Sequence, residues 1–160
     1  MKTTLEAVPA GLFSSTFDVH EGGAVIGRIV NRAFFRERGT LETGGLTFSA
    51  DRERGLRTSY TLRSAAGEPV ARAERQGLLR EAYRVSFEGT EWILTKKALA
   101  MRDTLVISDA SGDIGRIVQI NLLSRRLLFE AATGVPPEIG LFLIWIALMV
   151  RRRTGAGSAS

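Results

Sequence analysis

The sequence contains one stretch that no ordinary surface helix or strand could carry: twelve consecutive residues, Ile139 to Val150, without a single charged side chain. Two prolines and Glu138 precede this stretch, and three arginines, at positions 151–153, follow it. Prolines and acids are typical of the first turn of a helix, and bases are typical of its C-terminal end. The pattern therefore predicts a helix over about residues 137–152. Because this helix has no polar face, protein or lipid must enclose it on every side.

The length of the apolar stretch favours enclosure by protein. Twelve helical residues rise roughly 18 Å, whereas the hydrocarbon core of a bilayer is roughly 30 Å thick. A barrel of strands tilted by about 40° has a similar height to the helix, roughly 18 to 20 Å. The alternative is a tail-anchored protein whose residues 131–150 span the membrane, which would bring Glu138 and two prolines into the bilayer. We therefore expect the helix to form the core of a barrel, with five buried side chains in particular: Leu141, Phe142, Ile144, Trp145 and Leu148.

Most of the remaining chain is typical of an all-β protein, because short alternating segments are separated by Gly, Asp and Ser. Turn-forming residues between two such segments predict hairpins within 87–92 and 107–114. Ten strands are predicted, at Thr16–His20, Val25–Asn31, Leu46–Ala50, Leu56–Arg63, Pro69–Arg75, Tyr83–Glu88, Trp92–Lys96, Leu105–Ser108, Ile114–Ile120 and Leu127–Ala131. Two more are expected near Leu12–Phe13 and Thr40–Leu41. About twelve strands would leave room for one helix inside a closed barrel.

A short motif recurs along the chain. The residues Ile-Gly-Arg-Ile-Val begin at Ile26 and again at Ile114, and Val-Ala-Arg-Ala lies between them, so that small residues recur at intervals of 44 positions: Gly27, Ala71 and Gly115. Since alternate strand residues face opposite sides of a sheet, we expect the small residues to face inward and the arginines that follow them to face outward. Glycine weakens the interior of a strand, so its use here indicates a close approach to the sheet, which we assign to the helix.

Composition limits the organisation and the chemistry of the chain. Its 160 residues have room for one domain, which we place at residues 1–153, followed by a disordered tail at 154–160. The chain has no cysteine and one histidine, which excludes disulfide scaffolds, thiol nucleophiles and the common zinc sites. No nucleophile paired with a base and no phosphate-binding loop is recognisable, so we predict a protein that is not an enzyme and has no cofactor or metal. The N-terminus lacks the apolar run of a secretory signal, which predicts a cytoplasmic protein.

The chain is basic, with a formal net charge of +5, and this favours an anionic partner. The patterns of common nucleic-acid-binding modules are missing, so the expected partner is anionic membrane lipid or another protein, and not nucleic acid. We expect a monomer. The candidates for contact with lipid headgroups are two pairs of adjacent bases: Lys96 and Lys97, and Arg125 and Arg126. The alternative for Lys96 and Lys97 is that they are ordinary solvent-exposed residues at the end of a strand. A third basic segment, with Arg52, Arg54 and Arg57, is partly neutralised by the acids within it.

Several of these features occur together in one known group of proteins. The repeated Gly-Arg strands, the segment Trp92-Ile93-Leu94, the turn at 109–112 and the apolar helix after Pro136-Pro137-Glu138 resemble the tubby C-terminal-like superfamily, in particular its LURP-one-related and phospholipid-scramblase-like branches. The resemblance covers about residues 15–153. It implies a twelve-stranded β-barrel wrapped around a C-terminal hydrophobic helix. It also implies contact with membranes, since tubby proteins bind phosphoinositides and scramblases act on phospholipids.

The sequence thus leads to one main hypothesis and two alternatives. The main hypothesis is a non-enzymatic β-barrel that binds anionic phospholipid headgroups or a protein partner through a basic rim, at the cytoplasmic face of the inner membrane. The alternatives are a phospholipid-scramblase-like activity and the tail-anchored membrane protein described above.

Overall fold

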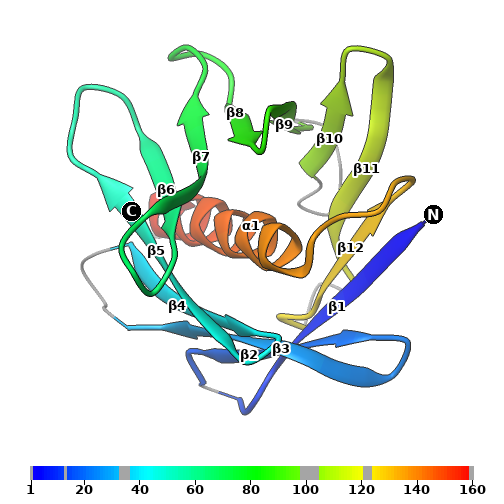
Figure 1. Cartoon of the computed structure of the whole chain (residues 1–160). Coiled ribbons are helices and arrows are strands. Elements are labelled where there is room, and N and C mark those ends of the chain that lie inside the picture. The colour runs from blue at the N-terminus through cyan, green and yellow to red at the C-terminus, as the bar shows by residue number, and fades with distance from the viewer. Residues whose placement is uncertain (1, 13, 33–36, 98–104, 121–123, 159–160) are drawn as a thin grey trace.

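The structure is a computed structural model in which residues 2–12, 14–32, 37–97, 105–120 and 124–158 are described, with side chains up to position 153. Within these residues, twelve strands surround a single helix, α1 (Pro137–Ser158), which runs through the middle of the molecule (Figure 1). The strands are β1 (Thr3–Pro9), β2 (Thr16–Glu21), β3 (Ala24–Asn31), β4 (Arg38–Thr43), β5 (Leu46–Glu53), β6 (Ser59–Arg63), β7 (Pro69–Arg75), β8 (Ala82–Phe87), β9 (Thr90–Lys96), β10 (Leu105–Asp109), β11 (Gly112–Gln119) and β12 (Leu127–Ala131).

The strands form one closed antiparallel barrel, as the sequence predicted. Each strand pairs with its neighbours in the sequence, and β1 closes the barrel by pairing with β12, where Leu5 lies opposite Phe129. The ten predicted strands and the one expected near Thr40–Leu41 are all present. The expectation of a strand near Leu12–Phe13 was wrong, because Leu12 lies in a turn and the twelfth strand is β1; Phe13 is outside the described residues.

Helix α1 is the centre of the core. Leu141, Phe142, Ile144 and Trp145 have no exposed surface, whereas Leu148 is only partly buried and packs against the core from its edge. The backbone of α1 approaches strands β3, β4 and β12 most closely. Burial of this apolar surface is the main source of stability for such a fold, at about 25 cal/mol per Å². The enclosure that the sequence required is therefore supplied by the chain's own sheet.

The tail-anchored alternative does not match these element boundaries. It required residues 131–150 to cross a bilayer as one helix, but Ala131 ends strand β12 and α1 begins only at Pro137. Across the ranges that the structure describes, no helix combines enough length with enough apolar character to cross a membrane.

The C-terminal end of the helix differs from the prediction. Glu138 lies in the first turn, as expected, but α1 continues to Ser158 and has no basic residue in its last turn. Residues 154–158, predicted as part of a disordered tail, are helical. The arginines at 151–153 therefore lie within the helix, and Arg153 binds a carboxylate of the barrel instead of capping the helix end.

The repeated motif lies at equivalent places in β3, β7 and β11. In each case the strand that precedes it in the sequence pairs with it through a register shift, which occurs next to Val19, Leu62 and Ile107. The small residues face inward as predicted. A Cβ atom at Gly27 would lie 2.8 Å from Leu141 Cδ2 of the helix, which confirms the close approach there. At Gly115 the prediction was wrong, because the nearby atoms belong to the neighbouring strand β12 and not to the helix.

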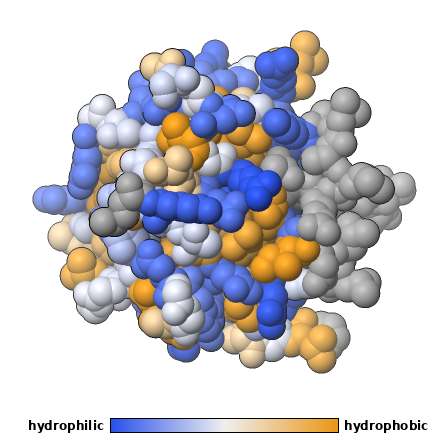
Figure 2. Space-filling view, turned by 90° about the vertical axis from the view of Figure 1, so that its right-hand side faces the viewer, coloured by the Kyte–Doolittle hydropathy of each residue, from blue (hydrophilic) through white to orange (hydrophobic). Residues whose placement is uncertain are grey.

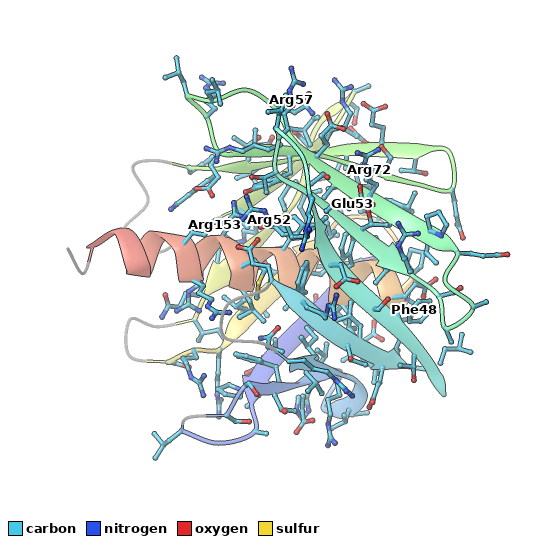
Figure 3. All side chains as sticks on the ribbon, turned by 90° about the vertical axis from the view of Figure 1, so that its left-hand side faces the viewer. Phe48, Arg52, Glu53, Arg57, Arg72 and Arg153 are labelled. Atoms are coloured by element: carbon cyan, nitrogen blue, oxygen red, sulfur yellow. The ribbon has the colours of Figure 1, made fainter. Side chains whose placement is uncertain are left out.

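The two ends of the barrel differ in their connections. The end at which α1 begins, which we call the turn end, has mostly two-residue turns, such as Gly22-Gly23 and Gly44-Gly45. Both glycines of each turn have positive φ, as a type I′ hairpin turn requires. The opposite end, which we call the loop end, has the connections at 10–15, 32–37, 54–58, 76–81, 97–104 and 120–126, and α1 leaves the barrel there. In Figure 3 the labelled Phe48 lies toward the turn end, and Arg153 lies toward the loop end.

Candidate functional site

Charged side chains cover the outer wall of the barrel (Figure 3), and many of them form ion pairs with a neighbouring strand. Arg28 of the repeat lies 3.0 Å from Asp18, and the equivalent Arg116 lies 2.9 Å from Glu130. Exposed pairs of this kind typically contribute about 0 to 1 kcal/mol each. On the side formed by β10, β11, β12 and β1, Figure 2 shows hydrophobic surface interspersed with charged side chains. The wall thus offers few charges that are free to bind another molecule.

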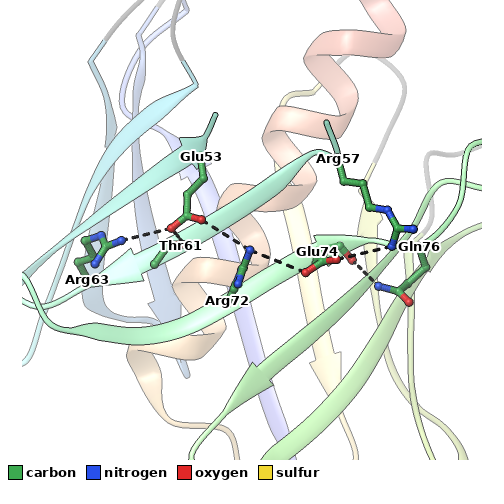
Figure 4. Close-up of polar contacts among 7 residues, drawn as sticks. All are labelled: Glu53, Arg57, Thr61, Arg63, Arg72, Glu74 and Gln76. Carbon is green, nitrogen blue, oxygen red and sulfur yellow. Dashed lines mark hydrogen bonds and ion pairs between the residues drawn. The ribbon is translucent and has the colours of Figure 1, made fainter. Parts of the chain in front are cut away.

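The third wall arginine of the repeat belongs to a larger network on β5, β6 and β7 (Figure 4). Arg72 lies between two carboxylates, 3.7 Å from Glu53 and 3.8 Å from Glu74. Arg63 binds Glu53 at 3.2 Å, and Arg57 binds Glu74 at 3.8 Å. Within the basic segment at 52–57 that the sequence singled out, this network engages Arg57, while Arg52 lies 3.6 Å from Glu37.

Four exposed basic side chains have no hydrogen-bond or ion-pair partner within the described ranges: Arg32, Arg54, Arg80 and Lys97. Each one lies in a different connection, and all four of these connections are at the loop end. Since the strands pair in sequence order, the four connections follow one another around the rim. The free bases therefore form an arc, which we call the basic rim.

Unpaired acids gather at the opposite end of the barrel. Five exposed carboxylates have no partner in the part of the chain that the structure describes, and all lie in the turns or at the adjoining strand ends of the turn end: Glu21, Glu42, Glu68, Glu88 and Asp113. The molecule is therefore electrically asymmetric, with free positive charge at one end and free negative charge at the other. Such a charge distribution orients a protein in the field of a charged surface.

The structure places all four sequence-predicted headgroup candidates at the loop end, but three of them have partners within the protein. Lys96 lies 3.9 Å from Glu81, and Arg126 lies 3.6 Å from Glu6. Only Lys97 is exposed and unpaired among the described residues, and it belongs to the basic rim. The pattern of adjacent bases thus identified one base, Lys97, that is free within the described residues.

Arg125 has a structural role. Its two terminal nitrogens donate to the backbone carbonyls of Gly11 and Ser14, at 2.7 and 2.8 Å, and its guanidinium lies over the Phe17 ring at 5.6 Å. These contacts join the connection at 120–126 to the connection at 10–15. Arg125 therefore helps to hold the rim together.

Sequence reasoning missed Arg32 and Arg80 as members of the rim, and it treated Arg54 as neutralised. Arg32 and Arg80 are single bases in the sequence, without a basic neighbour next to them. Only the barrel topology brings them to the same end. The signal that could have found them is their position: each lies in a connection that joins one predicted hairpin to the next.

A second polar cluster closes the barrel at the loop end. The carboxylate of Glu37 accepts hydrogen bonds from Arg153 of the helix and, at 3.0 Å, from the hydroxyl of Tyr60. Burial raises the pKa of Tyr60 strongly, and the neighbouring Glu37 carboxylate raises it further. Burial acts to lower the pKa of Arg153, but its hydrogen bonds with Glu37 and the electrostatic attraction of Tyr60, Glu37 and Tyr83 together outweigh this effect, and the pKa is raised. Tyr60 therefore stays neutral and Arg153 stays charged at neutral pH, and with their hydrogen bonds to Glu37 they form a structural clamp.

Comparison of the chain with protein-family models, with curated proteins and with solved structures finds no match in any of the three. The resemblance to the tubby-like superfamily therefore stays a prediction. Within the described residues, no three His, Cys, Asp or Glu side chains are grouped so that they could hold a metal ion.

Proposed function

We propose that the protein is a peripheral membrane-binding domain whose loop end binds anionic phospholipid headgroups. The observation that carries this proposal is the separation of unpaired charge, with the basic rim at the loop end and the free acids at the turn end. A molecule with this asymmetry is attracted to an anionic surface by one end and repelled from it by the other.

The arrangement of the rim favours an extended surface over a small ligand. Its four bases come from four successive connections, so they are spread along the rim and do not converge on one point. A single phosphate-binding pocket would need several donors aimed at one position. A membrane, in contrast, presents many headgroups in one plane, and each base near such a surface contributes about 1 kcal/mol.

The experiment is a vesicle co-sedimentation assay with phosphatidylcholine vesicles that contain or lack phosphatidylserine. We expect binding only to the anionic vesicles and a loss of binding as salt is raised, since surface charges are screened within about 8 Å at physiological ionic strength. Removing two rim charges with Arg54→Ala and Arg80→Ala should weaken binding by about 2 kcal/mol, or roughly 30-fold.

A control variant lowers the net charge by the same amount at the other end. Ala65→Glu and Ala66→Glu add two negative charges to the exposed connection between β6 and β7 at the turn end. This variant should bind nearly as well as the unchanged protein. Equal weakening by both variants would show that only net charge matters, and absence of binding to anionic vesicles would remove the proposal.

A further inference from the structure

Fully exposed leucines gather at the loop end. Leu56, Leu78 and Leu79 are 107%, 92% and 102% exposed. Leu12, in the connection at 10–15, is also exposed at this end, whereas the exposed large apolar residues near the turn end, Val25 and Leu46, keep a substantial part of their surface covered. Single exposed apolar side chains are common on proteins, but side chains without any cover, at the tips of loops and all at one end, are not.

Three of these leucines belong to adjacent loops. Strands β6 and β7 pair along their length, so the connections at 54–58 and 76–81 lie side by side at the rim. A hydrogen bond from the Arg75 amide to the Thr58 carbonyl, at 2.9 Å, and the Arg57–Glu74 ion pair hold the bases of the two loops together. We call the three side chains Leu56, Leu78 and Leu79 the leucine edge.

Two bases of the rim flank the leucine edge directly. Arg54 lies two positions before Leu56, and Arg80 follows Leu79, and both are exposed and unpaired among the described residues. Apolar tips next to free bases match the layers of an anionic membrane, in which phosphate groups lie directly above hydrocarbon. A groove on an acidic protein could also offer apolar surface and negative charge, but it would not present them as two layers, one above the other.

We propose that the leucine edge inserts into the acyl-chain boundary of the bilayer while Arg54 and Arg80 bind the phosphate layer above it. This inference rests on the proposed function and specifies how the loop end is seated on the membrane. Transfer of a leucine side chain out of water is favourable, so even partial insertion of three leucines adds an attraction that salt does not screen.

The chain has no cysteine, which allows one probe to be placed at a chosen position. Leu79→Cys, labelled with a nitrobenzoxadiazole fluorophore, reports from the leucine edge, and Leu46→Cys, labelled in the same way, is the matched control at the turn end. With phosphatidylserine-containing vesicles, we expect the label at position 79 to shift its emission to shorter wavelength and to be quenched by brominated acyl chains. The label at position 46 should show neither change.

A second variant measures the contribution to binding. Replacing the leucine edge by alanine should weaken vesicle binding by about tenfold or more, and the remaining binding should be abolished at lower salt than for the unchanged protein. The residues make few contacts, so thermal unfolding should be unaffected. Vesicle binding with an unshifted label at position 79, or with full affinity in the alanine variant, would overturn the inference and leave the proposed function in place. Absence of any vesicle binding would overturn both.

Discussion

Arg153 and Glu37 lie 116 positions apart in the sequence and form a two-point ion pair, in which Nε is 2.7 Å from Oε1 and Nη2 is 2.6 Å from Oε2. Both side chains are mostly buried. The pair fastens the C-terminal part of the central helix to the rim of the barrel, and the guanidinium also lies over the Tyr60 ring at 5.7 Å. It replaces the helix-end capping that the sequence suggested for the arginines.

Replacing Glu37 by glutamine should destabilise the protein. The change keeps the shape of the side chain but leaves Arg153 without a carboxylate partner in a mostly buried position, which typically costs about 2 kcal/mol. Urea unfolding followed by circular dichroism measures the loss. Glu68→Gln is the matched control, since Glu68 is exposed and unpaired among the described residues. Equal stability of the two variants would show that the clamp contributes nothing.

The two tyrosines of the chain should make the fold sensitive to alkaline pH. Burial raises the pKa of both Tyr60 and Tyr83, and the nearby carboxylates of Glu37 and Glu81 raise them further. Below about pH 10, the pKa of tyrosine in an unfolded chain, both states keep the tyrosine protons, and the contribution of the raised pKa to stability is fully present. Above this pH the unfolded chain releases protons that the folded protein keeps, so the contribution is lost. We therefore expect stability to fall above about pH 10.

The absorbance of tyrosinate near 295 nm tests this directly, because the chain has only these two tyrosines. Tyrosinate should appear together with the loss of circular dichroism, and not before it. In Tyr60→Phe the alkaline transition should move to higher pH. Ionisation of either tyrosine in the intact fold at its ordinary pKa would contradict the burial seen in the structure.

Most of the fold prediction rested on the apolar stretch at 139–150, because a helix without a polar face can be buried in only a few kinds of structure. Strand β1 was missed for a physical reason: its inward positions are Thr3, Leu5 and Ala7, of which only Leu5 has the size that marks a buried strand residue. The continuation of the helix to Ser158 was missed because the small residues after Arg153 distinguish only weakly between a helix and a disordered tail.

The candidate site was less accessible to sequence reasoning than the fold. Doublets of bases pointed to Lys97, but they also pointed to Arg125, whose carbonyl partners at Gly11 and Ser14 are more than a hundred positions away. Whether a base is free depends on such distant partners. The basic rim and the leucine edge follow from strand order, which brings single residues from separate hairpins to one end.

Trp145 should be shielded from solvent. Its ring is fully buried, and its Nε1 donates to Asn31 Oδ1 at 3.0 Å. In Trp92→Phe, which leaves Trp145 as the one tryptophan, emission should lie at short wavelength and resist quenching by acrylamide. The same protein in urea provides the exposed reference. Quenching of the folded protein as strong as in urea would place Trp145 outside the barrel.

Helix α1 and strand β4 approach each other closely at Gly39. A Cβ atom there would lie 2.5 Å from Trp145 Nε1 and 3.0 Å from its Cδ1. The ring has little room to move, because it is hydrogen-bonded to Asn31 and meets the Tyr60 ring edge-on at a centroid distance of 5.2 Å. Gly39→Ala should therefore force a shift of the helix or the strand and destabilise the protein by about 1 to 3 kcal/mol.

Gly134→Ala is the matched control for this substitution. A Cβ atom at Gly134 would meet nothing within 4 Å, and Gly134 is not among the residues with positive φ. Both substitutions reduce the freedom of the unfolded chain equally, which on its own stabilises a protein by about 0.4 to 1 kcal/mol. The difference between the two variants in urea unfolding therefore isolates the steric conflict with Trp145. If Gly39→Ala were as stable as Gly134→Ala, the helix could not lie against β4 at the depth that the structure gives it.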